Sequence, residues 1–340
     1  MVRSLICLAL FSSSVALCQQ DTLPYTLFSN NIVLYTDLGF NSSPFSIKDD
    51  FIGGLDKLQF KHNLKATQGL GVMYQWFSLR LGFTLPGTLR NSDRWGKTRY
   101  SDLRLSFSVK RMYCDVGIRH YRGYVVKNAY PWNDTLSADQ PHEFRPNTRS
   151  NSVSVNTWYF FNKNFRMPVV IGKVGHYKKA QYSGYLRGTI NIFGVGNDTI
   201  PLVPELLIDT TQNKSSVHTI TAVDIGLIPG FAYVNRIDNW QFSVLGGFGG
   251  VIQARFLESK KGTRGFLGLA PRFDVRFNAG YSQPKYFVML ITDFDFKSIR
   301  QNELVYFQSY YSLRIAAGIR CNRKPKKSAK AGVIAKPGGS

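Results

Sequence analysis

The chain has 340 residues, of which 44% are hydrophobic and 14% aromatic, and its formal net charge is +22. No stretch after residue 20 is apolar for long enough to form a membrane-spanning helix, so a membrane location would require a β-barrel. In a soluble protein this positive charge would favour nucleic acid as a partner. The N-terminal signal described next indicates export, and an exported chain does not meet cellular nucleic acid, so we expect no nucleic-acid partner.

The N-terminus has the pattern of a secretory signal. A basic residue, Arg3, precedes an apolar core, and small residues lead up to Cys18. We predict that residues 1–18 are a signal peptide cleaved after Cys18, with lipoprotein processing at that cysteine as the alternative. Residues 19–30 would then be an N-terminal periplasmic segment of a protein from a Gram-negative bacterium.

After the signal, stretches of strand-like sequence follow one another at short intervals. The predicted strands or hairpins, in chain order, are Asn31–Phe40, Gly69–Thr84, Tyr100–Tyr124, Ser150–Phe161 paired with Phe165–His176, Gly184–Gly194, Val217–Val234 paired with Trp240–Phe256, Gly268–Phe296, and Leu304–Arg320. The intervening Phe51–Thr67 is less regular, and Leu257–Arg264 is expected to be a basic loop.

The hairpin at residues 268–296 has the clearest pattern. Phe273, Val275 and Phe277 alternate with Arg272, Asp274 and Arg276, which places apolar groups on one face and polar groups on the other. A chain that repeats this pattern after an export signal is typical of a barrel that is apolar toward lipid and polar toward its lumen.

Short turns alternate with long polar loops, such as 126–148 and 195–216, as they do in outer-membrane barrels. We therefore predict an all-β fold, a single antiparallel transmembrane up-and-down β-barrel over residues 31–321, followed by a basic, disordered tail at 322–340. The predicted strands number thirteen, whereas such a barrel needs an even number. Either Glu205–Thr211 contains a fourteenth strand, or one of the three single strands lies outside the wall and the number is twelve.

Several segments resemble a known family. These are YFFNKNF from Tyr159, HYKKAQYSGYLRGTINIFG from His176, YQWFSLRLGFTLP from Tyr74 and DVGIRHYRGYVV from Asp115. The chain resembles domain-of-unknown-function family 4421, predicted outer-membrane barrels of Bacteroidetes-type bacteria. Where that family usually has a turn followed by Ser-Ala-Gly-Ser, this chain has Gln181-Tyr182-Ser183-Gly184. The resemblance implies the fold and the location, and it implies no catalytic residues.

The alternation also predicts which charged side chains line the lumen. The lumen-lining candidates are Arg80, Arg104, Arg119, Arg187, Arg255, Arg272, Asp274, Arg276, Asp293, Asp295 and Arg314, and the same alternation also turns Asp102, Asp115 and Arg320 inward. Their excess of arginine would favour anionic solutes in a channel. Alternatively, arginine and aspartate on neighbouring strands pair with one another and fill the lumen.

No recognisable nucleophile motif, phosphate-binding loop or zinc pattern accompanies the five histidines, so we expect no enzyme, no cofactor and no metal. Two functions remain. The first is a porin-like narrow channel in the outer membrane, surrounded by lipid and preferring anionic solutes. The second is a non-transporting structural or assembly barrel that binds another envelope component through its long loops or its basic tail.

Overall fold

The computed structural model describes residues 23–322 except 29, 52–53, 64, 88–91, 208–215, 260–261 and 302–303. The expected signal peptide and nearly all of the basic tail lie outside the described residues. None of the helices in the described part of the chain is long and apolar enough to cross a membrane.

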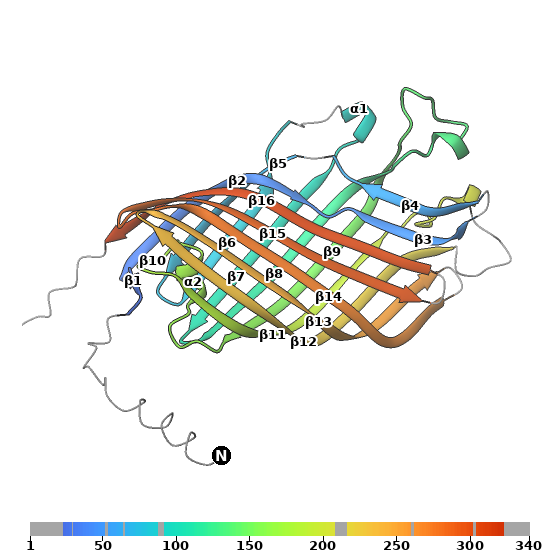
Figure 1. Ribbon diagram of the computed structural model, residues 1–340. Helices are drawn as coiled ribbons and strands as arrows, with labels where there is room; N and C mark the ends of the chain where they lie inside the picture. Colours follow the sequence, from blue (N-terminus) through green and yellow to red (C-terminus); the bar gives the residue numbers. More distant parts are fainter. Residues whose placement is uncertain are drawn as a thin grey trace, which may run out of the picture.

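Twelve strands of the described chain form one closed antiparallel ring (Figure 1). In order around the ring they are β2 (Asn31–Ser42), β5 (Ala66–Tyr74), β6 (Phe77–Thr84), β7 (Arg99–Val109), β8 (Met112–Val126), β9 (Glu143–Phe160), β11 (Gln181–Gly196), β12 (Val217–Ile237), β13 (Trp240–Ser259), β14 (Gly262–Ser282), β15 (Tyr286–Gln301) and β16 (Leu304–Asn322). The ring closes where β16 pairs with β2.

Alternation of side chains decides which face of each strand meets lipid. On β14, Phe273 and Phe277 are exposed on the outside, whereas Arg272 and Asn278 are buried in the lumen. Exposed Leu, Ile, Phe and Val side chains recur on the other wall strands. The fold is therefore a transmembrane β-barrel, as the sequence predicts.

The two ends of the barrel differ. Short turns join β5 to β6, β7 to β8, β12 to β13 and β14 to β15 at the end where both the first and the last wall strand terminate, and we call this the turn end. The opposite, loop end carries the connections around the short helices α1 (Ser92–Trp95), η1 (Tyr130–Trp132) and η2 (Glu205–Leu207). In Figure 1 the turn end is on the left.

The predicted strand Phe165–His176 is wrong. This segment enters the turn end of the lumen as helix α2 (Met167–Val170) and strand β10 (Gly175–Tyr177), which pairs with β1 (Tyr25–Leu27). All four residues of α2 are buried, so the segment has no lipid-facing side and cannot be a wall strand. Gly172, at φ 76°, then reverses the chain in the left-handed region that favours glycine.

This correction settles the strand number at twelve. All three strands predicted singly lie in the wall, as β2, β11 and β16. Glu205–Leu207 is a helical turn, and the residues that follow it, 208–215, lie outside the described part.

At the loop end, two further strands enter the sheet. The irregular stretch after β2 forms a hairpin of β3 (Phe45–Phe51) and β4 (Leu55–Lys61), which pairs with β16 on one side and with β8 on the other. The hairpin thus lies above the ends of the shorter strands β5, β6 and β7. It closes part of the rim over the lumen.

The expected basic loop Leu257–Arg264 is instead the tip of the β13–β14 hairpin. Its β14 arm is paired with β13 alone, because pairing with β15 begins only at Phe273. Pro271, which has no N–H to donate, lies where this pairing stops. A gap between β14 and β15 therefore opens at the loop end.

Candidate functional site

The lumen is the region where polar and charged side chains gather, and the turn end of it is filled by a plug. We define the plug as residues 165–177 together with β1. Helix α2 packs against Trp158, Tyr185 and Leu245 of the wall. The plug therefore adds an apolar layer across the lumen.

The side chain of Gln241 on β13 holds the plug through hydrogen bonds to backbone groups of the plug. Its Nε2 donates hydrogen bonds to the carbonyl oxygens of Val169 (2.8 Å) and Val170 (2.9 Å). Its Oε1 accepts a hydrogen bond from the N–H of Tyr177 (2.9 Å). One buried amide thus satisfies three backbone groups of the plug.

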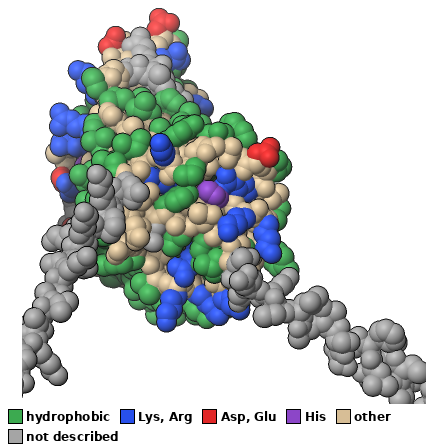
Figure 2. All heavy atoms as spheres, turned by 90° about the vertical axis from the view of Figure 1, so that its left-hand side faces the viewer, with side chains coloured by type: hydrophobic (Ala, Val, Ile, Leu, Met, Phe, Trp, Pro, Cys, Tyr) green, Lys and Arg blue, Asp and Glu red, His purple; other side chains and the backbone are tan. Residues whose placement is uncertain are grey.

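Arg320 of β16 is the second anchor. Its Nη2 donates to the carbonyl oxygen of Gly172 (2.6 Å) and its Nε to that of Lys173 (2.8 Å). Figure 2, which views the molecule from the turn end, shows several Lys and Arg side chains among hydrophobic ones on this face.

The protonation of His176, on the plug, should make the seating of the plug depend on pH. Burial and the nearby charges of Arg236, Arg320 and Lys178 lower the pKa of His176 to about 4. A free histidine has a pKa of about 6.5, so a displaced plug takes up a proton between these values, whereas a seated plug does not. Seating is therefore fully favoured above pH 6.5 and weakens as the pH falls toward 4.

Hydrogen exchange measures this effect. We expect the protection factors of residues 165–177 to fall between pH 7 and pH 4.5, and to fall much less in His176→Gln. Equal pH dependence in the two proteins would show that another group is responsible.

Above the plug, a layer of buried ion pairs crosses the lumen. Arg80 of β6 donates from Nε and Nη2 to the carboxylate of Asp37 (2.6 and 2.7 Å), and from Nη1 to that of Asp102 (2.6 and 2.7 Å). Glycines at 69 and 82 leave room for these groups, because a Cβ at either position would collide with them.

Asp293 of β15 is the counter-ion of three arginines. Its carboxylate lies 2.5 Å from Arg276 Nε, 2.6 Å from Arg314 Nη2 and 3.7 Å from Arg104 Nη1. All four side chains are at most 15% exposed. These contacts join β7, β14, β15 and β16 across the lumen.

The remaining charges of the layer are also in contact with partners. The further pairs are Arg272 with Asp224, Arg187 with Asp274, Arg104 with Asp115, and Lys297 with Asp295. The guanidinium of Arg119 lies over the ring of Tyr310, with Cζ 3.7 Å from its centroid. The layer is therefore a network rather than a lining of separate charges.

The loop end of the lumen is closed by an apolar cap. The inner face of the β3–β4 hairpin and the connection after β11 supply the buried side chains Phe45, Ile47, Leu58, Phe60, Leu202, Val203 and Leu207. These belong to one hydrophobic cluster with wall residues such as Phe193 and Tyr306.

Little space remains between these three layers. Two cavities of about 50 Å³ each lie in the lumen, one between the plug and the Asp293 cluster and one beside Arg119 and Asp274, and a third has about 10 Å³. A water molecule occupies about 30 Å³ of liquid. Each of these cavities has room for one or a few water molecules, which is small compared with the aqueous lumen of an open pore.

The structure places ten of the eleven lumen-lining candidates in this network, together with the inward Asp102 and Asp115. Arg255 differs, because it lies at the gap between β14 and β15. There it donates hydrogen bonds to the carbonyl oxygens of Leu269 (2.9 Å) and Arg300. Gln253 beside it donates to the carbonyl oxygen of Ser298 (3.0 Å), so side chains satisfy groups that no neighbouring strand reaches.

The sequence analysis missed four charged residues of the lumen. Asp37 and Asp224 are the inward positions of β2 and β12, and the same alternation could have identified them. Lys297 follows Asp293 and Asp295 in the inward register of β15. Lys173 carries no such signal because it lies on the plug.

The lumen offers no evident catalytic arrangement among the described residues. Ser42 Oγ lies 3.2 Å from His62 Nε2, but both residues are buried and the same nitrogen accepts a hydrogen bond from the N–H of Ser43 (2.9 Å). The imidazole is thus held as a structural acceptor. No group of His, Cys, Asp and Glu suited to a metal ion occurs among the described residues.

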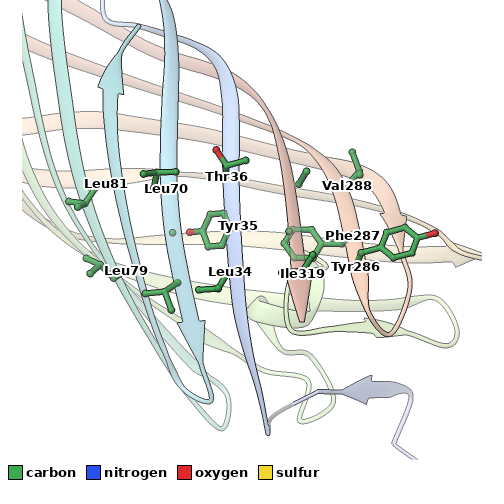
Figure 3. A pocket seen from close by; sticks show the side chains of 14 residues that line it. Leu34, Tyr35, Thr36, Leu70, Leu79, Leu81, Tyr286, Phe287, Val288 and Ile319 are labelled. Carbon is green, nitrogen blue, oxygen red and sulfur yellow. The ribbon is translucent and has the colours of Figure 1, made fainter. Parts of the chain in front are cut away.

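A separate groove of about 780 Å³ lies on the lipid-facing side of the barrel. Figure 3 shows Leu34, Leu70, Leu79 and Leu81 on one part of it, and Tyr286, Val288 and Ile319 on the other. Tyr35 and Phe287 contribute to its floor beside Gly71 and Gly318. Its apolar lining is that of a surface in contact with acyl chains.

The closed ring, the apolar exterior and the polar interior define a transmembrane β-barrel protein. The chain belongs to the family described as Domain of unknown function (DUF4421), whose model matches residues 21–320. The family resemblance inferred from the sequence is thereby confirmed.

Several solved structures align with this chain at very low sequence identity and low TM-scores. The β domain of the Bordetella autotransporter BrkA is 10% identical with a TM-score of 0.36, the alignment covering 86% of this chain and 100% of that one. OmpT of Vibrio cholerae is 8% identical with a TM-score of 0.32, over 87% and 99% of the two chains. The Pseudomonas putida toluene transporter TodX is 6% identical with a TM-score of 0.26, over 86% and 90%. No curated protein matches the sequence.

Proposed function

We propose that this protein is a closed, non-conducting barrel of the outer membrane of a Gram-negative bacterium, and that it serves as a platform for another envelope component. The turn end would face the periplasm and the loop end would face outward, because outer-membrane barrels have short turns on the periplasmic side and long loops on the outer side. The signal peptide predicted at residues 1–18 supports export.

The observation that carries the proposal is the filling of the lumen along its whole length. The plug, the ion-pair network and the apolar cap follow one another from end to end. Moving any of them would separate buried charges or expose apolar surface, both of which are costly. A permanently filled barrel is better suited to holding a surface in place than to passing solutes.

The loop end offers such a surface. Leu206 is 64% exposed there, and Tyr130 and Ile200 are 44% and 40% exposed. These residues lie in the two long loops from which the sequence predicts partner binding. Exposed apolar side chains on outer loops favour contact with a protein or glycan partner, and the tail could add charge to that contact.

A narrow channel that prefers anions is the second candidate. It is favoured by the charge of the lumen, where the cations Arg80, Arg104, Arg119, Arg187, Arg272, Arg276, Arg314, Lys173 and Lys297 outnumber the anions Asp37, Asp102, Asp115, Asp224, Asp274, Asp293 and Asp295. Conduction would require the plug to leave. Neither candidate is an enzyme, and neither needs a cofactor.

Conductance in a planar bilayer separates the two candidates. We expect the refolded full chain, once its heat-modifiable gel mobility confirms a folded barrel, to produce no steady single-channel current. A steady current with anion selectivity would overturn the closed-barrel proposal and support the channel.

A further inference from the structure

The outer face of the β3–β4 hairpin carries two lysines, Lys48 and Lys57, that make no ion pair within the described part of the chain. Lys48 and Lys57 lie directly opposite each other in the antiparallel register, and both point away from the lumen. Like charges at such a position repel. Neither lysine takes part in an ion pair among the described residues, although Asp50 and Asp56 are close in sequence.

These lysines line a groove of about 410 Å³ on the outside of the barrel. The groove lies where the β3–β4 hairpin joins the wall strand β16, which in turn pairs with β15. Its other side is aromatic, because the rings of Phe296 and Phe307 lie 5.9 Å apart there. Ser46 and Gln59 lie between the two sides and offer hydrogen-bonding groups.

The groove continues directly into the lipid-facing surface. Phe294 and Tyr311 form the next outward pair toward the membrane, and they are 37% and 43% exposed. Aromatic side chains with cations above them are typical of the boundary between acyl chains and headgroups. A ligand here would therefore meet apolar side chains at one end and two positive charges at the other.

We propose that this groove binds the phosphorylated headgroup of a lipid in the leaflet at the loop end. The phosphate would lie between Lys48 and Lys57 and relieve their repulsion, and the acyl chains would pack on Phe296 and Phe307. Charge-assisted hydrogen bonds to phosphate are stronger than neutral ones. This site does not depend on whether the lumen conducts.

The test measures lipid bound to the refolded full chain by native mass spectrometry. Diphosphorylated lipid A is titrated into detergent-solubilised wild type, the variant Lys48→Gln with Lys57→Gln, and the conservative variant Lys48→Arg with Lys57→Arg. We expect the glutamine variant to bind at least about tenfold more weakly and the arginine variant to bind like wild type. Lys178→Gln with Lys179→Gln, which removes equal charge from exposed positions at the turn end, should leave binding unchanged.

Competition with inorganic phosphate identifies the source of the phosphate group. We expect millimolar phosphate to displace little lipid, because the aromatic side of the groove contributes to binding only when acyl chains are present. Equal binding by the glutamine variant and wild type would overturn the proposal. So would full displacement of the lipid by free phosphate, and so would a matching loss in the turn-end control.

Discussion

Replacing Asp293 with alanine is expected to lower the free energy of unfolding by about 3–5 kcal/mol, because it leaves buried arginines without their counter-ion. Arg276 and Arg314 would each lose their short contact to this carboxylate, and Arg104 a longer one. Urea unfolding of the refolded barrel in detergent, followed by heat-modifiable gel mobility, measures the loss.

An exposed ion pair provides the matched control. Arg149 and Asp198 lie 2.6 Å apart, but their side chains are 45% and 63% exposed. Asp198→Ala should therefore cost less than about 1 kcal/mol. If both aspartate variants lose the same amount, the buried network does not stabilise the barrel in the way its geometry implies.

Removing both anchors of the plug, by Gln241→Ala with Arg320→Ala, should release it from the lumen. Each backbone group left buried without a partner costs about 1–3 kcal/mol, and the two anchors serve several such groups. Since about 1.4 kcal/mol corresponds to a factor of ten, we expect trypsin to cut after Lys173 at least about 100-fold faster. Lys173 is 8% exposed in the seated plug, and mass spectrometry identifies its peptide bond among other cleavage sites.

Two side chains at the same end serve as controls. The hydrogen bonds of Gln181 and Arg111 involve residues outside the plug, so Gln181→Ala with Arg111→Ala should leave cleavage after Lys173 unchanged. An anchor-free protein that still resists trypsin at this bond would mean that apolar packing of α2 alone holds the plug.

The wall of the barrel could be predicted because one side of each strand meets lipid and the other does not. Around Arg272 and Phe273, polar and apolar residues alternate because successive side chains face the lumen and the lipid in turn. The partners of the charged groups could not be predicted in the same way, because they depend on the register between strands. Arg80 meets Asp37 from a strand 43 residues earlier, and no pattern within either strand indicates the match.

The plug could not be predicted for a different reason. Met167, Val169 and Val170 are enclosed on every side, so the sequence has no period of two there. A continuous apolar run between polar turns can be a short strand or part of a packed insert, and its composition does not distinguish them. The β3–β4 hairpin was missed because its inner face forms part of the apolar cap and its outer face carries lysines, without the lipid-facing residues of a wall strand.

The gap between β14 and β15 has a consequence for how the barrel withstands fluctuations. From Phe273 to the turn end, β14 is joined to both neighbouring strands by backbone ladders. From Phe273 to the loop end, its free edge relies on side chains such as Gln253 and Arg255. A few side-chain hydrogen bonds open at a lower free-energy cost than a continuous backbone ladder, so local opening is easier at this edge. The membrane-spanning part of the barrel is therefore rigid, whereas the β14 edge at the loop end can open locally while the ring stays closed.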